Sequence, residues 1–260
     1  MANLTTRILI LATAVGILAG VNIVRPWEDD GPSTQLGTAG VELGEDTARI
    51  VERVAYRQEV ERVGDVIVID GQPRDDVAAD LDELWAIVDA TWPTSLRDEL
   101  AQLSVVREDE RGLVGVVHPS VTGGWILSLD IADVDDRALI EETIVHELSH
   151  VVTLDNEVFT FGEVDGCSGT QIALGCAVAG SVLSAFAERF WPGDVGSTQA
   201  EEFVNDYAST AAHEDLAETF TGWVLGWPLE GATVEAKIAM LSADPDLAAL
   251  AADLRARLLA

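Results

Sequence analysis

Basic residues are scarce in this chain, and their scarcity narrows its range of partners. The 260 residues include 15 Lys and Arg against 46 Asp and Glu, which gives a formal net charge of −31 at pH 7. Nucleic acids and anionic lipid headgroups are bound through clustered positive charge, so we expect no nucleic acid partner. Apolar residues nonetheless make up 48% of the chain. The sequence therefore has the material for a hydrophobic core and is not an acidic disordered tail.

Cysteine is also scarce, with only Cys167 and Cys176 in the chain. Two cysteines are too few for a disulfide-rich scaffold or for a zinc site built from four thiolates. Their role depends on the compartment, because a pair of thiols forms a lasting disulfide only where the environment is oxidising.

The N-terminal segment indicates the compartment. Residues 8–24 form an almost unbroken apolar run, which as a helix would span roughly 25 Å, the short end of the range for crossing a bilayer. Arg7 precedes the run and three acidic residues follow Arg25, so the positive-inside rule predicts a cytoplasmic N-terminus and an exported remainder. We interpret residues 1–27 as a signal anchor, a single transmembrane helix in the cell membrane. Cleavage of this segment, which would release a secreted protein, is the alternative.

The rest of the chain divides into a linker and one domain. Residues 28–46 are rich in Gly, Pro, Ser, Thr and acidic residues, a composition typical of a flexible linker. Residues 47–260 predict an α+β domain, with a small mixed-sheet lobe over 47–135 and a helical lobe over 136–260.

Export decides the expected role of the cysteines. The exported part, from residue 28 onward, carries 13 basic and 46 acidic residues, a net charge of −33. In an oxidising compartment we predict a disulfide between Cys167 and Cys176. Closing a loop of about ten residues would contribute roughly 2–3 kcal/mol to stability in the chain-entropy account.

Local periodicity outlines the secondary structure. Apolar residues recur with helical spacing over several stretches, and the predicted helices are 47–62, 75–91, 95–103, 137–154, 176–190 and 214–225. Short apolar runs bounded by turn residues predict strands at 66–69 and 125–130, and a hairpin of 104–107 with 113–118.

The strongest chemical signal is the run His146-Glu147-Leu148-Ser149-His150, which lies within the predicted helix over 137–154. Residues i and i+4 share one face of a helix, so both imidazoles can reach a single metal ion. Two neutral imidazoles suit Zn²⁺, and Glu147 is placed to take a proton from a water at the metal. The pattern predicts a catalytic site with one zinc ion per chain.

A catalytic zinc ion needs a third protein ligand and an open position. Glu214 and Glu218 share one face of the predicted helix over 214–225. One of them could bind the metal while the other accepts the remaining ring N–H of a ligand histidine. The spacing leaves their roles open, since acidic residues also favour a helix N-terminus in proteins without a metal.

The HExxH motif is followed by a second pattern, Y-x-x-T-x-x-x-E-x-x-A-E-x-F, whose residues here are Tyr207, Thr210, Glu214, Ala217, Glu218 and Phe220. Together the two motifs resemble the catalytic domain of the anthrax lethal factor family of zinc metallopeptidases, within the gluzincins. The resemblance covers roughly residues 140–225 and implies a zincin-like metallopeptidase fold.

The resemblance also implies a role for each matching residue. Glu147 would be the general base, and the zinc ligands would be His146, His150 and Glu214. Tyr207 would stabilise the oxyanion that forms during amide hydrolysis, for which a neutral phenol is a suitable donor. Glu218 would be an acidic residue behind a zinc ligand.

The strand predicted at 125–130 directly precedes the helix that carries the histidines. In zincin-like folds this strand lies at the edge of the sheet, and an extended peptide can pair along it. By this analogy we predict that residues 125–130 form a substrate-binding edge. A plain hairpin end, allowed by Gly123 and Gly124, is the alternative.

These features predict a membrane-anchored zinc peptidase, a metalloendopeptidase that hydrolyses peptide bonds outside the cell through a metal-activated water. Two other functions stay open: a catalytically inactive binding domain with the zincin fold, and a zinc hydrolase of non-peptide amides or esters. The negative field of the exported part favours basic peptide or protein substrates.

Overall fold

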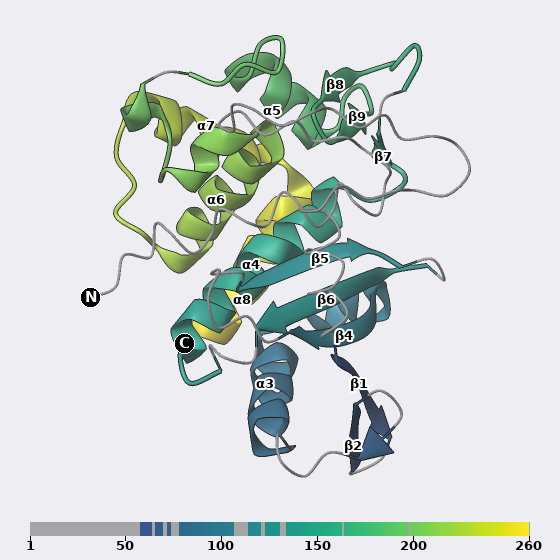
Figure 1. Ribbon diagram of the computed structural model, residues 1–260. Helices are drawn as coiled ribbons and strands as arrows, with labels where there is room; N and C mark the ends of the chain where they lie inside the picture. The colour runs from purple at the N-terminus through teal and green to yellow at the C-terminus, as the bar shows by residue number, and fades with distance from the viewer. Residues whose placement is uncertain are drawn as a thin grey trace, which may run out of the picture.

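The computed structural model describes residues 58–63, 66–69, 72–73, 78–106, 114–120, 123–130, 134–162, 164–197 and 199–259. The predicted membrane anchor (1–27) and the predicted linker (28–46) lie outside these residues. Within the described ranges, no helix combines the length and the apolar content needed to cross a membrane. The described part is a mixed α+β structure, as the sequence predicts (Figure 1).

Six strands form the main sheet, in the spatial order β3-β2-β1-β4-β6-β5. Their bounds are β1 (Gln58–Val63), β2 (Val66–Ile69), β3 (Gln72–Pro73), β4 (Leu100–Val106), β5 (Gly115–Pro119) and β6 (Trp125–Asp130). Neighbouring strands are antiparallel except β4 and β6, which run parallel. β5 is an edge strand of this sheet, and its partner there is β6.

In the described part of the chain, six α-helices and three 3-10 helices accompany the sheet. The α-helices are α3 (Ala78–Thr91), α4 (Arg137–Thr153), α5 (Val182–Phe190), α6 (Ala212–Leu225), α7 (Ala232–Ala243) and α8 (Pro245–Leu258). The 3-10 helices are η2 (Thr94–Glu99), η4 (Ala200–Glu202) and η5 (Tyr207–Thr210). The helices predicted over 75–91, 137–154 and 214–225 are found as α3, α4 and α6, with small shifts of their ends.

Two predictions about strand order are wrong. The hairpin of 104–107 with 113–118 does not form, because β6 lies between β4 and β5 in the sheet. The strand at 125–130 is found as β6, but its predicted edge position is incorrect. Five of the six residues of β6 are buried, and a strand buried on both faces belongs in the interior of a sheet.

One predicted helix is replaced by a strand at its described end, and another over part of its length; residues 47–57 lie outside the described residues. Residues 58–62, predicted as the end of a helix over 47–62, lie in β1, where Val60 is opposite both Ile69 and Leu103. The helix predicted over 95–103 survives only as η2, and the chain continues as β4 from residue 100. Strands paired on both sides supply the hydrogen bonds and the side-chain neighbours that outweigh local periodicity.

A second, three-stranded sheet interrupts the region predicted as a helical lobe over 136–260. Its order is β7-β9-β8, with bounds β7 (Phe159–Phe161), β8 (Thr170–Ile172) and β9 (Gly175–Ala177). The helix predicted over 176–190 therefore begins only at Val182 as α5. A Cβ atom on Gly175 would lie 2.2 Å from the carbonyl oxygen of Thr160, so only glycine allows β7 and β9 to approach this closely.

The predicted disulfide between Cys167 and Cys176 is confirmed. Cys176 is the central residue of β9, and Cys167 lies in the loop that leads to β8. The bond ties that loop to the small sheet, at the far end of α4 from β1 and β2 (Figure 1).

Helix α4 is the central element of the fold. Twelve of its 17 residues are buried, because β5 packs against one side of the helix while α3, α6 and α8 pack against others. The contact with β5 is close: a Cβ atom on Gly115 would lie 2.5 Å from the methyl group of Thr143. This packing fixes the part of α4 that carries the histidines between the sheet and α6.

Candidate metal centre

His146 and His150 project from the same face of α4. Their Nε2 atoms lie 3.1 Å apart, and each residue is 5% exposed. Two imidazole nitrogens at this distance, with no other group between them, are arranged to share one bound atom. The i, i+4 spacing in a buried helix produces this arrangement directly.

Glu214 is contributed by α6, which packs across α4. Its Oε2 atom lies 3.1 Å from Nε2 of His146 and 3.3 Å from Nε2 of His150. A tetrahedral zinc site with bonds of about 2.0–2.1 Å has ligand atoms roughly 3.3 Å apart. The three residues can therefore hold a metal ion, and two nitrogens with one carboxylate suit zinc and related divalent metals.

The electrostatics of the three side chains also suit a cation. Burial lowers the pKa of His150 to about 4, so this imidazole is neutral and keeps a lone pair for a metal at neutral pH. Burial opposes ionisation of Glu214, but the histidines around it outweigh burial and hold its pKa well below the ordinary value. Contacts with Glu214 and Glu218 overcome the effect of burial on His146 and raise its pKa well above normal. Metal binding would release the proton of His146.

Glu218 lies behind His146, one helical turn after Glu214. Its Oε1 atom is 2.7 Å from Nδ1 of His146, the ring nitrogen that faces away from Glu214. Asn205 donates a hydrogen bond from Nδ2 to the other oxygen of Glu218 and accepts one from the backbone N–H of Ala208 at 2.8 Å. A carboxylate in this position fixes the orientation of a ligand imidazole.

Glu147 is fully buried beside the three ligand atoms. Its Oε2 atom accepts a 2.8 Å hydrogen bond from the backbone N–H of Val117 in β5. Its Oε1 atom has no hydrogen-bond partner in the part of the chain that the structure describes. Burial raises the pKa of Glu147 to about 8, with a further contribution from Glu214, while His146 opposes the rise. The carboxyl group can therefore exchange a proton near neutral pH.

Tyr207 lies at the start of η5, with its ring centroid 5.8 Å from that of His146. The side chain is buried, and among the described residues its hydroxyl has no hydrogen-bond partner. Burial, followed by the charges of Glu214 and Glu147, raises its pKa well above the ordinary value. The phenol therefore remains a neutral donor beside the ligand atoms.

His213 is a member of this cluster that sequence reasoning did not single out. Its Nε2 atom lies 3.2 Å from Oε1 of Glu214, and its ring centroid is 5.8 Å from that of His150. Adjacent helical residues usually face different directions, so the spacing rule that found the other histidines gives no reason to group this one with them. The available signal was composition, since His213 is one of only four histidines in the chain and precedes Glu214.

Glu142 adds a further acidic group to the same side of α4. It lies one turn before His146, and its pKa is raised to about 7 by burial and by the charge of Glu218, with His146 opposing the rise. The structure thus gathers six predicted site residues around one point: His146, Glu147, His150, Tyr207, Glu214 and Glu218.

Comparison of the chain with models of known protein families, with curated proteins and with solved structures found no match.

Proposed function

We propose that this chain is a zinc-dependent peptidase of the gluzincin type, with a zincin-like fold. The observation that carries the proposal is the convergence of His146, His150 and Glu214 within 3.3 Å of one another, with the Glu147 carboxylate beside them. This is the donor set and the neighbouring base that metal-assisted amide hydrolysis needs.

The residues around the metal position divide the chemical work. A bound zinc ion would act as a Lewis acid toward the scissile carbonyl and would acidify water. Oε1 of Glu147 is free to accept the proton of the attacking water, and a pKa of about 8 lets it carry that proton to the leaving amine. The Tyr207 hydroxyl is a neutral donor for the oxyanion, and Glu218 holds the ring of His146 in place.

Strand β5, rather than β6, is the strand that a bound peptide could extend. It lies at the edge of the sheet and donates a backbone hydrogen bond from Val117 to Glu147. A peptide paired beside it would bring its scissile bond close to that carboxylate. Residues 115–118 are buried, so this route requires β5 to become accessible when substrate binds.

The disulfide supports a location outside the cytoplasm. Structural disulfides persist in oxidising compartments, and Cys167 and Cys176 form one in the described structure. With residues 1–27 as a single-pass anchor, the peptidase domain would face the extracytoplasmic side, or would be secreted if the anchor is cleaved. Substrates would be peptides or proteins, with a preference for basic ones that weakens as salt increases.

The test combines metal content with hydrolysis in the full-length chain. We expect one zinc per chain by elemental analysis and cleavage of members of a broad peptide library. Glu147→Gln should keep the zinc and lose activity by about 10²–10⁴-fold, since it removes a general base. The matched control is Glu141→Gln on the same helix, whose side chain pairs with Arg137 at the surface. Equal activity in the two variants would contradict the proposed role of Glu147.

A second candidate function is a binding domain with a structural metal and no catalysis. One observation favours it: the three ligand residues are at most 5% exposed, as in a closed structural site. His213, whose Nε2 atom contacts Oε1 of Glu214 at 3.2 Å, would have to move to become a fourth ligand. In that case the wild type would hold zinc and unfold on chelation, yet cleave no peptide, amide or ester in the library. A wild type without metal would contradict both candidates.

A further inference from the structure

Lys237 is the only lysine in the chain, and it is buried at 1% exposure in α7. Its Nζ atom donates to the backbone oxygen of Glu202 at 2.6 Å and lies 2.9 and 2.7 Å from the two carboxylate oxygens of Asp215. Burying an ammonium group is costly unless its donors are satisfied, and here three oxygens satisfy them. Lys237 is thus a fixed internal cation rather than a surface charge.

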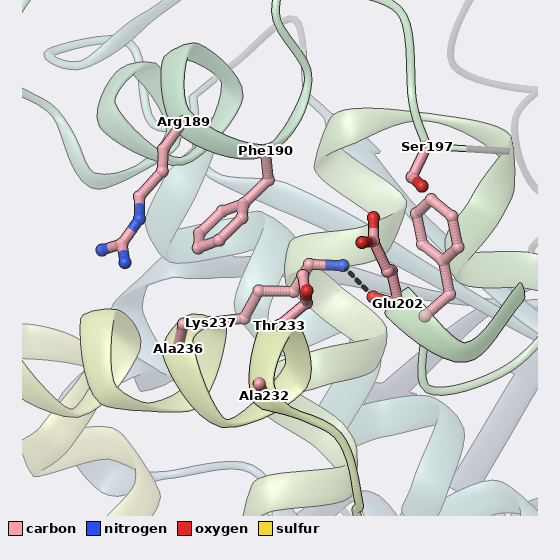
Figure 2. Close-up of a pocket in the computed structure, with 9 residues that line it drawn as sticks. Arg189, Phe190, Ser197, Glu202, Ala232, Thr233, Ala236 and Lys237 are labelled. Carbon is pink, nitrogen blue, oxygen red and sulfur yellow. Dashed lines mark hydrogen bonds between the residues drawn. The ribbon is translucent and has the colours of Figure 1, made fainter. Parts of the chain in front are cut away.

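Two aromatic rings also lie close to the same ammonium group. The Nζ atom lies 4.4 Å from the ring centroid of Phe203 and 5.7 Å from that of Phe190, within the range of cation–π attraction. Figure 2 shows Lys237 at a pocket of about 370 Å³, with Phe190 beside it and its ammonium group bonded to Glu202. The position of the charge is therefore determined by α5, η4 and α7 together.

Asp215 is the point at which this cation reaches α6. The carboxylate is fully buried and also accepts hydrogen bonds from Nε1 of Trp191 at 2.8 Å and from the hydroxyl of Thr219 at 3.4 Å. Trp191 ends α5 and Lys237 lies in α7, so two neighbouring elements hold the first turn of α6 through one carboxylate. We call Asp215, Lys237 and Trp191 the α6 clamp.

The first turn of α6 is held by no capping side chain among the described residues, and its other buried acid, Glu214, contacts histidines of α4. The N-cap residue is Ala211, which supplies no capping hydrogen bond, whereas Asp136 and Ser181 cap α4 and α5. Asp215 directly follows Glu214, and adjacent residues point about 100° apart around a helix. The carboxylate of Glu214 therefore faces the histidines, while that of Asp215 faces Lys237 and Trp191.

This geometry couples the clamp to the metal position. A carboxylate oxygen lies roughly 6 Å from its helix axis, so a rotation of α6 by about 10° would move it by roughly 1 Å. Metal–ligand distances tolerate only about 0.2 Å of variation. A device that fixes the rotation of the first turn consequently fixes whether Glu214 can complete the ligand set.

We propose that the α6 clamp positions Glu214 for metal binding, with Asp215 and Lys237 as positioning residues that act through Glu214. The inference rests on the metal site of the proposed function. An ion pair that only stabilises the packing of α5, α6 and α7 is the competing explanation. The two explanations differ in whether coordination geometry changes when the clamp is removed from a protein that still folds.

The test variant is Asp215→Asn/Lys237→Met in the full-length chain. Replacing both partners avoids an unpaired buried charge, and Asn retains an acceptor for Trp191. With the metal-free protein and Zn²⁺ alone as the probe, we expect the affinity to fall by about 10–100-fold. With Co²⁺ alone, the visible absorption bands should shift and change in intensity, because the ligand arrangement changes.

Two further variants keep the proposal open to refutation. Trp191→Phe removes only the indole donor to Asp215, and we expect a change in the same direction of about 2–5-fold, a fraction of the full effect. Val224→Ala creates a cavity near the other end of α6, so it should lower thermal stability while leaving zinc affinity and the Co²⁺ spectrum unchanged.

Three outcomes would overturn the inference. The double variant could keep the wild-type Co²⁺ spectrum and zinc affinity, which would make the clamp a packing feature only. Val224→Ala could weaken zinc binding as much as the double variant at equal loss of stability, which would assign the effect to stability. A wild type that binds neither metal would instead contradict the proposed function, and the inference would fall with it.

Discussion

Helix α6 buries two adjacent carboxylates whose pKa values are shifted in opposite directions. Glu214, 3% exposed, faces three histidines, and they hold its pKa well below the ordinary value despite burial. Asp215, fully buried, faces a permanent cation and an indole N–H, yet burial still raises its pKa. The first carboxylate is paired with imidazoles, which bind a metal through a lone pair when they are neutral, whereas the second is paired with an ammonium group and an indole N–H, which cannot.

This difference separates a binding group from a structural one. A carboxylate saturated by Lys237 and Trp191 has no capacity left for a ligand, so its effect is on the position of the helix. A carboxylate surrounded by imidazoles keeps one oxygen directed at a shared point, where a divalent ion can replace the proton. Burial alone therefore does not identify a metal ligand; the kind of partner does.

The largest expected effect separates the two carboxylates by stability. Asp215→Ala should lower the free energy of unfolding of the metal-free protein by about 3–5 kcal/mol, because it leaves Lys237 buried without its counter-ion. Glu214→Ala should cost much less, since His146 retains Glu218 as a partner. Urea unfolding in the presence of a chelator measures the stability loss of each variant. Equal losses would contradict the proposed difference between the two carboxylates.

Added zinc should reveal the role of Glu214, which the stability of the metal-free protein does not show. Zinc at about 100 times its dissociation constant should raise the unfolding free energy of the wild type by about 2.7 kcal/mol. Glu214→Ala should gain almost nothing at that concentration, because one ligand is missing. Thermal unfolding with and without zinc provides the measurement, and full stabilisation of the variant would remove Glu214 from the ligand set.

Among the described residues, Glu142 is a partly buried acid with no fixed cation beside it. It therefore tests the effect of burial without the paired cation that Asp215 has. Its pKa is raised from 4.5 to about 7, so below pH 4.5 it costs the folded state nothing, and the cost grows until pH 7. Glu142 should therefore subtract stability from the metal-free protein as pH rises through this window, alongside other buried groups that titrate there. Allowing for partial exposure, the loss is about 1–2 kcal/mol.

Glu142→Gln should reduce the loss of stability between pH 4.5 and pH 8 by about 1–2 kcal/mol relative to the wild type and make the metal-free protein more stable than the wild type at pH 8. Urea unfolding at pH 4.5 and pH 8 gives the comparison. Glu141→Gln, which changes the neighbouring surface-paired acid, is the control and should retain the wild-type profile. A stability change between the two pH values that is the same in Glu142→Gln and in the wild type would contradict this role of Glu142.

The smallest expected effect concerns His213, which contacts the outer oxygen of Glu214. His213→Gln should weaken zinc affinity by about tenfold, as the loss of a group that orients a ligand commonly does. Glu235→Gln on the exposed face of α7 is a charge-changing control. If His213→Gln abolished binding instead, His213 would be a metal ligand itself, which is the arrangement of the second candidate function.

Local pattern predicted the elements whose cause is local. The two histidines share a face because four residues make about one helical turn, and the apolar residues around them mark α4 as buried. The disulfide followed from compartment and spacing, and β2 and β6 followed from short apolar runs. The histidine pair and the two strands needed no knowledge of a distant residue, whereas the disulfide also relied on the N-terminal segment for its compartment.

The errors occur where the cause is distant. Residues 58–62 of β1 and 100–103 of β4 were predicted as helical because periodicity ignores the strands that pair with them. β6 was placed at an edge by analogy with zincin-like folds, whereas β4 and β5 flank it. His213 was not grouped with the site because only the approach of α6 to α4 brings its ring near Glu214.

The sequence by itself determined the ligand types, the i, i+4 pair on α4, the disulfide and the mixed α+β class. Only the tertiary structure decided that Glu214 Oε2 meets both Nε2 atoms, which lie 68 and 64 positions earlier in the sequence, and that the single lysine pairs with Asp215, the residue after Glu214. The physical reason is that side-chain spacing within a helix is set by backbone geometry. The meeting of two helices is set by how their buried faces and buried charges are satisfied together.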